Sequence, residues 1–194
     1  MKLQLSRSFS TTNVLLSAVS DSGDNLTPLY YIHTPGLFTR KTSFIYKIAP
    51  DVAERFKGRG TLKEEDLASQ EEIARIHWHM VSCSKLVYNG EIVTFKELMP
   101  RRGFWGIARG LQGTDGRSYV WKESINSCHL DVDDGSKPTV KVAQFHQRNI
   151  LTGRKANLEI FPEGDHMLDL IVITWHYIET RRRDKEKRNS GGGG

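Results

Sequence analysis

The sequence lacks several features that define specialised classes of protein. Its two cysteines, Cys83 and Cys128, are too few for the dense disulfide framework of small secreted domains. The start of the chain includes Gln4, Ser6 and Arg7, so it does not develop the continuous apolar stretch of a signal peptide. We therefore expect a reducing, cytoplasmic setting.

No apolar run is long enough to cross a bilayer. The most apolar segment covers residues 167–178, whereas a transmembrane helix needs ~20 mostly apolar residues. The hydrophobic fraction of 38% and the charged fraction of 26% are close to those of ordinary globular domains. We expect a single domain over residues 1–187, followed by a flexible tail at 188–194.

Positive charge is concentrated near the C-terminus. The formal net charge is +5, and residues 181–188 hold six basic and two acidic side chains, which leaves about +1 for the rest of the chain. A nucleic-acid groove needs basic residues spread along a binding face. We therefore expect no nucleic-acid partner.

Motifs for catalysis and metal binding are incomplete. The chain has no G-x-S-x-G motif, and its seven histidines have no spacing that predicts a base beside Ser or Cys. His77, His79 and Cys83 are too few ligands for a zinc site. Residues 131–135 resemble the start of a calcium loop, but Gly135 is at its fifth position rather than the sixth, and Val142 stands at the twelfth, where glutamate is required. We predict no catalytic, metal or cofactor-binding residues.

What the sequence does contain is a series of β-rich runs separated by turn residues. The clearest turn is Asn89-Gly90, because a tight type I′ hairpin needs positive φ at both central positions. Further turns are predicted at Asp115-Gly116, at residues 133–135 and, near the N-terminus, at residues 20–25. The pattern predicts a meander of antiparallel strands, and closure into a barrel would remove its edges.

Residues 50–71 depart from this pattern. They contain Lys57-Gly58-Arg59-Gly60 and a charged run at 63–66, with few apolar side chains to bury. We predict a mobile insertion that holds a short helix.

The segment 167–178 is apolar on nearly every face and therefore requires burial. Its β-branched residues favour a central strand, whereas Gly164 and Asp165 before it and the arginines at 181–183 after it favour a helix. Asp169 is either a functional acid or a carboxylate in the first turn of such a helix, at the mouth of the barrel. The pattern alone leaves helix and strand open.

Three segments carry a resemblance to a known family: Pro28-Leu29-Tyr30, residues 115–122 (DGRSYVWK), and residues 158–164 (LEIFPEG) running into 167–172 (MLDLIV). They resemble an uncharacterised domain family abundant in mushroom-forming fungi, whose members are similar to the tubby-like, LURP-one-related fold. The resemblance covers nearly all of residues 1–187. It implies a closed antiparallel β-barrel threaded by a hydrophobic helix from residue 166 to about 187. Better-studied relatives of that fold include tubby domains, which bind phosphoinositide head groups, and phospholipid scramblases, which act at membranes.

Two basic clusters, one of them beside an aromatic ring, predict contact with an anionic membrane surface. The candidate residues are Arg101, Arg102, Trp105, Arg181, Arg182 and Arg183. The competing interpretation is a solvated loop and a helix end whose cations satisfy its own dipole.

The leading hypothesis is a non-enzymatic module that binds an unidentified ligand or protein partner, with peripheral binding to anionic phospholipid. The first alternative is a soluble protein–protein scaffold that uses Trp105 or the 50–71 insertion as its contact surface. The second alternative is a small-molecule hydrolase whose site is assembled from distant parts of the chain.

Overall fold

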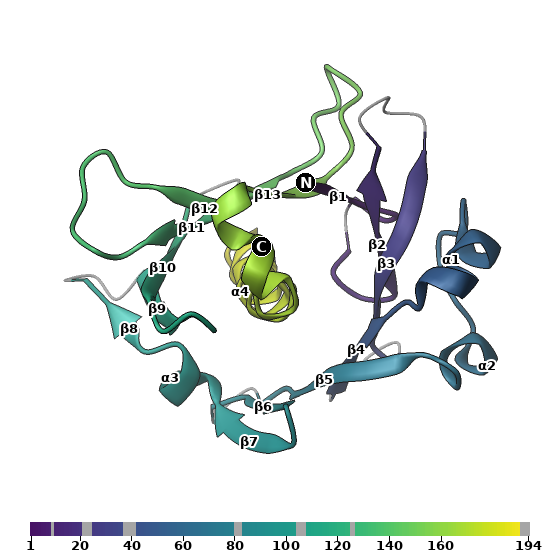
Figure 1. Cartoon of the computed structure of the whole chain (residues 1–194), viewed down its shortest axis with the longest axis horizontal. Helices are drawn as coiled ribbons and strands as arrows, with labels where there is room; N and C mark the ends of the chain where they lie inside the picture. Colours follow the sequence, from purple (N-terminus) through teal and green to yellow (C-terminus); the bar gives the residue numbers. More distant parts are fainter. Residues whose placement is uncertain are drawn as a thin grey trace.

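One long sheet curves around the C-terminal helix in the computed structural model (Figure 1). The structure describes residues 1–8, 10–20, 25–36, 42–79, 83–103, 108–124 and 127–190. The strands are β1 (Lys2–Leu5), β2 (Val14–Val19), β3 (Leu26–His33), β4 (Thr42–Lys47), β5 (Glu71–His77), β6 (Lys85–Tyr88), β7 (Glu91–Thr94), β8 (Arg101–Arg102), β9 (Ala108–Gln112), β10 (Ser118–Glu123), β11 (Cys128–Val132), β12 (Lys141–His146) and β13 (Asn157–Ile160). The helices are α1 (Pro50–Phe56), α2 (Glu64–Leu67), α3 (Phe95–Leu98), the 3-10 turn η1 (Pro162–Met167) and α4 (Leu168–Ser190).

The sheet consists of two antiparallel meanders joined at their first and last strands. Strands β1 to β7 follow one another, as do β8 to β13, and β1 pairs with β13 through partners such as Leu3 and Leu158. The N-terminal amino group of Met1 also donates to the carbonyl of Ile160 at 2.7 Å. The start of the chain is thereby fixed beside the strand that leads into α4.

The sheet has two edges, β7 and β8, in the described part of the chain. The short helix α3 lies between them and contacts both β7 and β9 (Figure 1). The predicted mainly β fold is confirmed. The predicted closure into a barrel is not, because β7 and β8 do not pair with each other in the described residues.

The predicted hairpin turns are confirmed by backbone geometry. Asn89 and Gly90 have φ values of 52° and 77°, and they join β6 to β7 as a type I′ turn requires. Gly116 and Gly135 also have positive φ and join β9 to β10 and β11 to β12. In the N-terminal hairpin, β2 pairs with β3, while residues 21–24 of its turn lie outside the described residues.

Helix α4 is enclosed by the inner face of the sheet. Ile171, Val172, Ile173 and Trp175 are fully buried. The expected burial is therefore confirmed for residues 170–178, whereas Leu168 and Asp169 are only partly buried. A helix can occupy this position because its backbone groups bond to one another and only side chains face the surrounding strands. The helix expected from the resemblance is also confirmed, although it begins at Leu168 and continues to Ser190, into the expected tail.

The 50–71 insertion covers the outer face of strands β2 to β4. Phe56, Leu62 and Leu67 are buried there against Leu15 and Tyr31. The expected short helix is confirmed by α1 and α2, whereas the expectation that this segment has too few apolar residues to bury is wrong. The sheet is apolar on both faces at this point, so a few apolar side chains from outside complete a second core.

Candidate functional site

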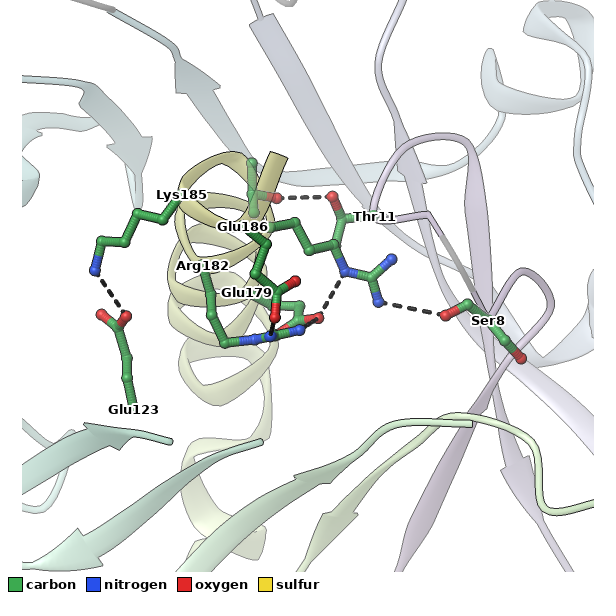
Figure 2. A network of polar contacts seen from close by, with 9 residues as sticks. Ser8, Thr11, Glu123, Glu179, Arg182, Lys185 and Glu186 are labelled. Atoms are coloured by element: carbon green, nitrogen blue, oxygen red, sulfur yellow. Dashed lines mark hydrogen bonds and ion pairs between the residues drawn. The ribbon is translucent and has the colours of Figure 1, made fainter. Parts of the chain in front are cut away.

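The C-terminal half of α4 contains a cluster of charged side chains at the rim of the sheet (Figure 2). Glu179, which is fully buried, accepts hydrogen bonds from Arg182 at 2.7 and 2.8 Å and from Nε of Arg183 at 2.6 Å. Arg182 also donates to Glu186. Burial alone would lower the pKa of Arg182, but the hydrogen bonds and charges of Glu179 and Glu186 raise it, so this side chain is a fixed cation.

The same helix end is tied to the surrounding sheet. Thr180 donates to the hydroxyl of Thr11 at 2.9 Å, and Lys185 pairs with Glu123 at 2.9 Å (Figure 2). Arg183 further donates to the carbonyl of Ser8 at 3.4 Å. These contacts fix the position of α4 relative to the N-terminal loop and β10.

A small depression lies beside this cluster and is bordered by basic side chains. We call this depression the basic end. Its volume is about 260 Å³, and it is lined by Ser8, Gln147, Arg148, Arg182, Arg183, Glu186, Lys187 and Ser190. Four of these side chains are basic and one is acidic. Arg148 and Lys187 are exposed to solvent. The depression therefore presents positive charge to an approaching anion.

The connection between β12 and β13 starts at this basic end and extends outward from the sheet (Figure 1). The side-chain oxygen of Asn149 accepts hydrogen bonds from the backbone N–H of Leu151 at 2.9 Å and of Thr152 at 3.2 Å. The backbone N–H of Asn149 also donates to the carbonyl of Arg154 at 2.9 Å. The tip is therefore an ordered turn.

Two large apolar side chains lie at the tip of this turn. Ile150 is 74% exposed and Leu151 is 97% exposed. All of residues 148–155 are exposed, and they include the basic side chains of Arg148, Arg154 and Lys155 but no acidic one. We call residues 148–155 the hairpin tip. It combines two exposed apolar side chains at the turn with basic side chains on both flanking segments.

A larger cavity, which we call the acidic pocket, lies at the opposite end of α4. It has a volume of about 660 Å³ and includes Tyr30, Lys47 and Asp169 in its lining. Lys47 Nζ lies 3.1 and 3.0 Å from the two carboxylate oxygens of Asp169, and the Tyr30 hydroxyl donates to the same carboxylate. Burial and the Asp169 carboxylate raise the pKa of Tyr30, so the phenol keeps the proton that it donates.

A family model for the family of unknown function DUF6593 matches residues 10–184. This chain belongs to the DUF6593 family. The match includes strands β2 to β13, the Lys47–Asp169 pair and the Glu179–Arg182 pair, whereas β1 precedes it. No curated protein and no solved structure matches the chain.

The DUF6593 structure separates the residues expected at an anionic surface. Arg101 and Arg102 are exposed on the edge strand β8, and Arg102 lies 3.8 Å from Asp133. Arg182 is buried, and Arg181 and Arg183 are partly buried on α4. Trp105 lies outside the described residues. The two arginine groups therefore occupy different elements, the edge strand β8 and the central helix (Figure 1).

Sequence reasoning missed the hairpin tip and the acidic pocket. A signal for the hairpin tip was present, because Ile150-Leu151 is an apolar pair in a turn between basic residues, where polar side chains are normally expected. Of the two interpretations of Asp169, a functional acid or a carboxylate in the first turn of a helix, the structure confirms the position in the first turn of α4. Its partner Lys47 lies on β4, where no local pattern indicates the pairing.

The histidines considered as metal ligands have other neighbours in this DUF6593 chain. His77 Nδ1 lies 3.3 Å from the hydroxyl of Thr42, and the backbone N–H of His79 donates to Ser84. Among the residues that the structure describes, no three His, Cys, Asp or Glu side chains are grouped as a metal site. In the same residues, no helix combines the length and apolarity needed to span a membrane.

Proposed function

We propose that this chain is a non-catalytic module that binds peripherally to anionic phospholipid membranes. The contact surface would consist of the hairpin tip and the exposed cations of the basic end. The observation that carries the proposal is the exposure of Ile150 and Leu151 at the tip of an ordered turn that is flanked by basic side chains. Such a turn can place apolar side chains below the lipid head groups while its cations remain among them.

Stable membrane attachment requires both apolar insertion and electrostatic attraction. Moving a Leu or Ile side chain out of water contributes ~1.5–3 kcal/mol, and each Lys or Arg near an anionic surface contributes ~1 kcal/mol. Either contribution alone gives weak, reversible binding, whereas apolar insertion together with a polybasic patch gives stable attachment. The hairpin tip has both contributions within one turn.

The cations assigned to the membrane differ from those expected from the sequence. Arg182 and Arg183 already neutralise Glu179, and Arg182 is nearly inaccessible. The proposed contacts are instead exposed side chains, namely Arg148, Arg154, Lys155 and Lys187. Arg182 and Arg183 would position the helix end beside the hairpin tip.

We also propose that the resemblance to the tubby-like fold extends to this architecture. A sheet that curves around a hydrophobic C-terminal helix supports it. The proposed membrane contact does not depend on this relationship, because it is argued from the hairpin tip of this chain.

Vesicle sedimentation tests the proposed function. Vesicles of phosphatidylcholine alone would be compared with vesicles that also contain phosphatidylserine, each at low and high salt. We expect binding to the anionic vesicles and its weakening by salt, because salt screens exposed charges. Equal, negligible binding to both kinds of vesicle would end the proposal.

Two pairs of variants separate the apolar and the electrostatic contributions. Replacing Ile150 and Leu151 by Ser should abolish stable attachment, while Ile92→Ser, at another apolar side chain that is 69% exposed, should have no effect. Arg154→Gln together with Lys155→Gln should weaken binding to anionic vesicles roughly 30-fold, since two cations contribute ~2 kcal/mol. Lys57→Gln together with Lys63→Gln is the matched charge control on the insertion.

A further inference from the structure

We propose that the acidic pocket binds a single-chain amphiphile whose head group is a protonated amine. The site is separate from the membrane contact, because the two lie at opposite ends of α4. Its residues come from β3, β4, both ends of the insertion, β6, the turn between β9 and β10, η1 and the first turn of α4.

The size and composition of the cavity suit an apolar chain. A volume of about 660 Å³ falls within the ~300–1,000 Å³ typical of pockets for small ligands. Apolar side chains contribute to its wall from several elements, among them Leu29, Ile48, Met167, Leu168 and Leu170. An alkyl chain that enters this space gains the free energy of leaving water.

The charges of the pocket select a cation. Its lining includes the carboxylates of Glu71, Asp165 and Asp169 against a single ammonium group, that of Lys47. With His166 neutral, the lining therefore carries a formal charge of −2. A carboxylate or phosphate head group would meet net repulsion here, whereas an ammonium group would be attracted.

The Asp169 carboxylate is fixed in position and can accept a further hydrogen bond from such a head group. The Tyr30 hydroxyl and the Lys47 ammonium fix its carboxylate, and its side chain remains 31% exposed. An ionised carboxylate has about four acceptor positions, and these partners occupy three of them through Tyr30 on Oδ1 and Lys47 on both oxygens. One position is left for a third donor.

A second depression extends the acidic pocket at the same carboxylate. It has a volume of about 270 Å³ and shares Glu71, Tyr88 and Asp169 with the larger cavity. Glu72 also lines it, but its carboxylate is already paired with Arg75. The junction of the two spaces therefore brings carboxylates together beside a tyrosine ring. We place the ammonium group at this junction and the chain in the larger cavity.

Calorimetric titration of the full chain with four probes tests the ligand class. Decylamine, decanol, decanoate and butylamine would be compared at neutral pH, below the concentrations at which they form micelles. We expect decylamine to bind about tenfold more tightly than decanol, as a charge-assisted hydrogen bond provides. Decanoate and butylamine should bind more weakly than decanol and decylamine, respectively. Binding of decanoate as tight as that of decylamine would overturn the proposal.

Substitutions of the two members of the Lys47–Asp169 pair should change the affinity for decylamine in opposite directions. A general loss of structure would lower the affinity in both variants. Asp169→Asn should weaken decylamine binding about tenfold, and Lys47→Met should strengthen it because the competing ammonium is gone. Asp134→Asn, at an exposed turn carboxylate, should leave it unchanged. If Asp169→Asn does not fold, Lys47→Met still decides, and unchanged or weaker amine binding in it contradicts the proposed site.

The titration must also be separated from binding at the apolar hairpin tip. The variant with Ser at positions 150 and 151 should bind decylamine as the wild type does. Loss of amine binding in that variant would place the amphiphile at the hairpin tip and reject the acidic pocket as its site.

Discussion

Arg182 and Glu179 form a two-point ion pair inside the fold, with Nε 2.7 Å from Oε2 and Nη2 2.8 Å from Oε1. Their side chains are only 5% and 0% exposed. Removing both charges from water is costly, and such a pair is tolerated only when good geometry and further hydrogen bonds compensate the loss of hydration. Arg183 and Glu186 provide these additional contacts.

Loss of the central carboxylate should therefore be strongly destabilising. We expect Glu179→Gln to lower the free energy of unfolding by about 3 kcal/mol, because it leaves the buried Arg182 without its main counter-charge. Urea unfolding with an unchanged m value would measure this. Glu186→Gln, at a side chain that is 49% exposed, should cost less than ~1 kcal/mol. Equal losses in the two variants would contradict a dominant role for the buried pair.

The buried part of α4 gives a second prediction. Ile171→Asp and Val172→Asp should each unfold the domain, since an unpaired buried charge costs several kcal/mol against a total stability of ~5–15 kcal/mol. Ile150→Asp is the matched control at an exposed isoleucine and should melt as the wild type does. Circular dichroism during heating distinguishes them, and wild-type melting of both core variants would be incompatible with the enclosed helix.

The sheet was largely predictable from the sequence because its determinants are local. Asn89-Gly90 fixes a hairpin through the φ values of two adjacent residues, and the strands on either side alternate or run apolar accordingly. The same holds for the turns at Gly116 and Gly135. Closure could not be judged in this way, since it depends on how far the sheet twists and on α3, which lies between its edges.

The central helix and the insertion required information that the local pattern does not contain. Ile171, Val172 and Ile173 favour strands by propensity, yet they lie in a helix that is buried against the inner face of the curved sheet. The insertion is polar in composition, yet Phe56 and Leu67 complete a core whose other half is on strands far earlier in the chain. Tertiary contacts decide both cases.

The charged sites show the same division between local and distant information. Glu179 precedes Arg182 and Arg183 by three and four residues, a spacing that predicts ion pairs along a helix and could have identified them as internally neutralised. Lys47 and Asp169 are 122 residues apart. Only the folded sheet brings them together, so the acidic pocket had no sequence signal beyond the position of Asp169.

A third prediction concerns the close packing of η1 against the sheet. A Cβ atom at Gly164 would lie 2.9 Å from the side chains of Ile171 and Val142 and from the Val142 carbonyl oxygen. Gly164→Ala should therefore destabilise the protein by ~1–3 kcal/mol through overpacking. At Gly60 no atom lies within 4 Å of such a Cβ, so Gly60→Ala should be neutral or slightly stabilising. Denaturant midpoints of the two variants test the contrast, and a neutral Gly164→Ala would contradict the tight contact.

The last prediction concerns acid stability and rests on His33. Its ring lies on β3 between those of Tyr31 and Phe44, at centroid distances of 6.2 and 6.3 Å, and its side chain is 16% exposed. Burial lowers the pKa of His33 below the ordinary value of 6.5, although Glu64, 3.8 Å from Nε2, partly opposes the shift. In the described structure its buried Nδ1 has no hydrogen-bond partner, which also disfavours the protonated ring.

The sign of the effect follows from proton uptake. Below pH 6.5 the unfolded chain protonates this imidazole while the folded chain still resists, so the free energy of unfolding decreases as the pH falls from 6.5 through the lower pKa of the folded state. We expect His33→Phe, which keeps an aromatic ring between Tyr31 and Phe44, to remove this part of the decrease. Urea unfolding over the mildly acidic range would compare the two slopes, and an NMR titration would follow the His33 ring directly. Titration of that ring above pH 6.5 would show that Glu64, rather than burial, controls its protonation.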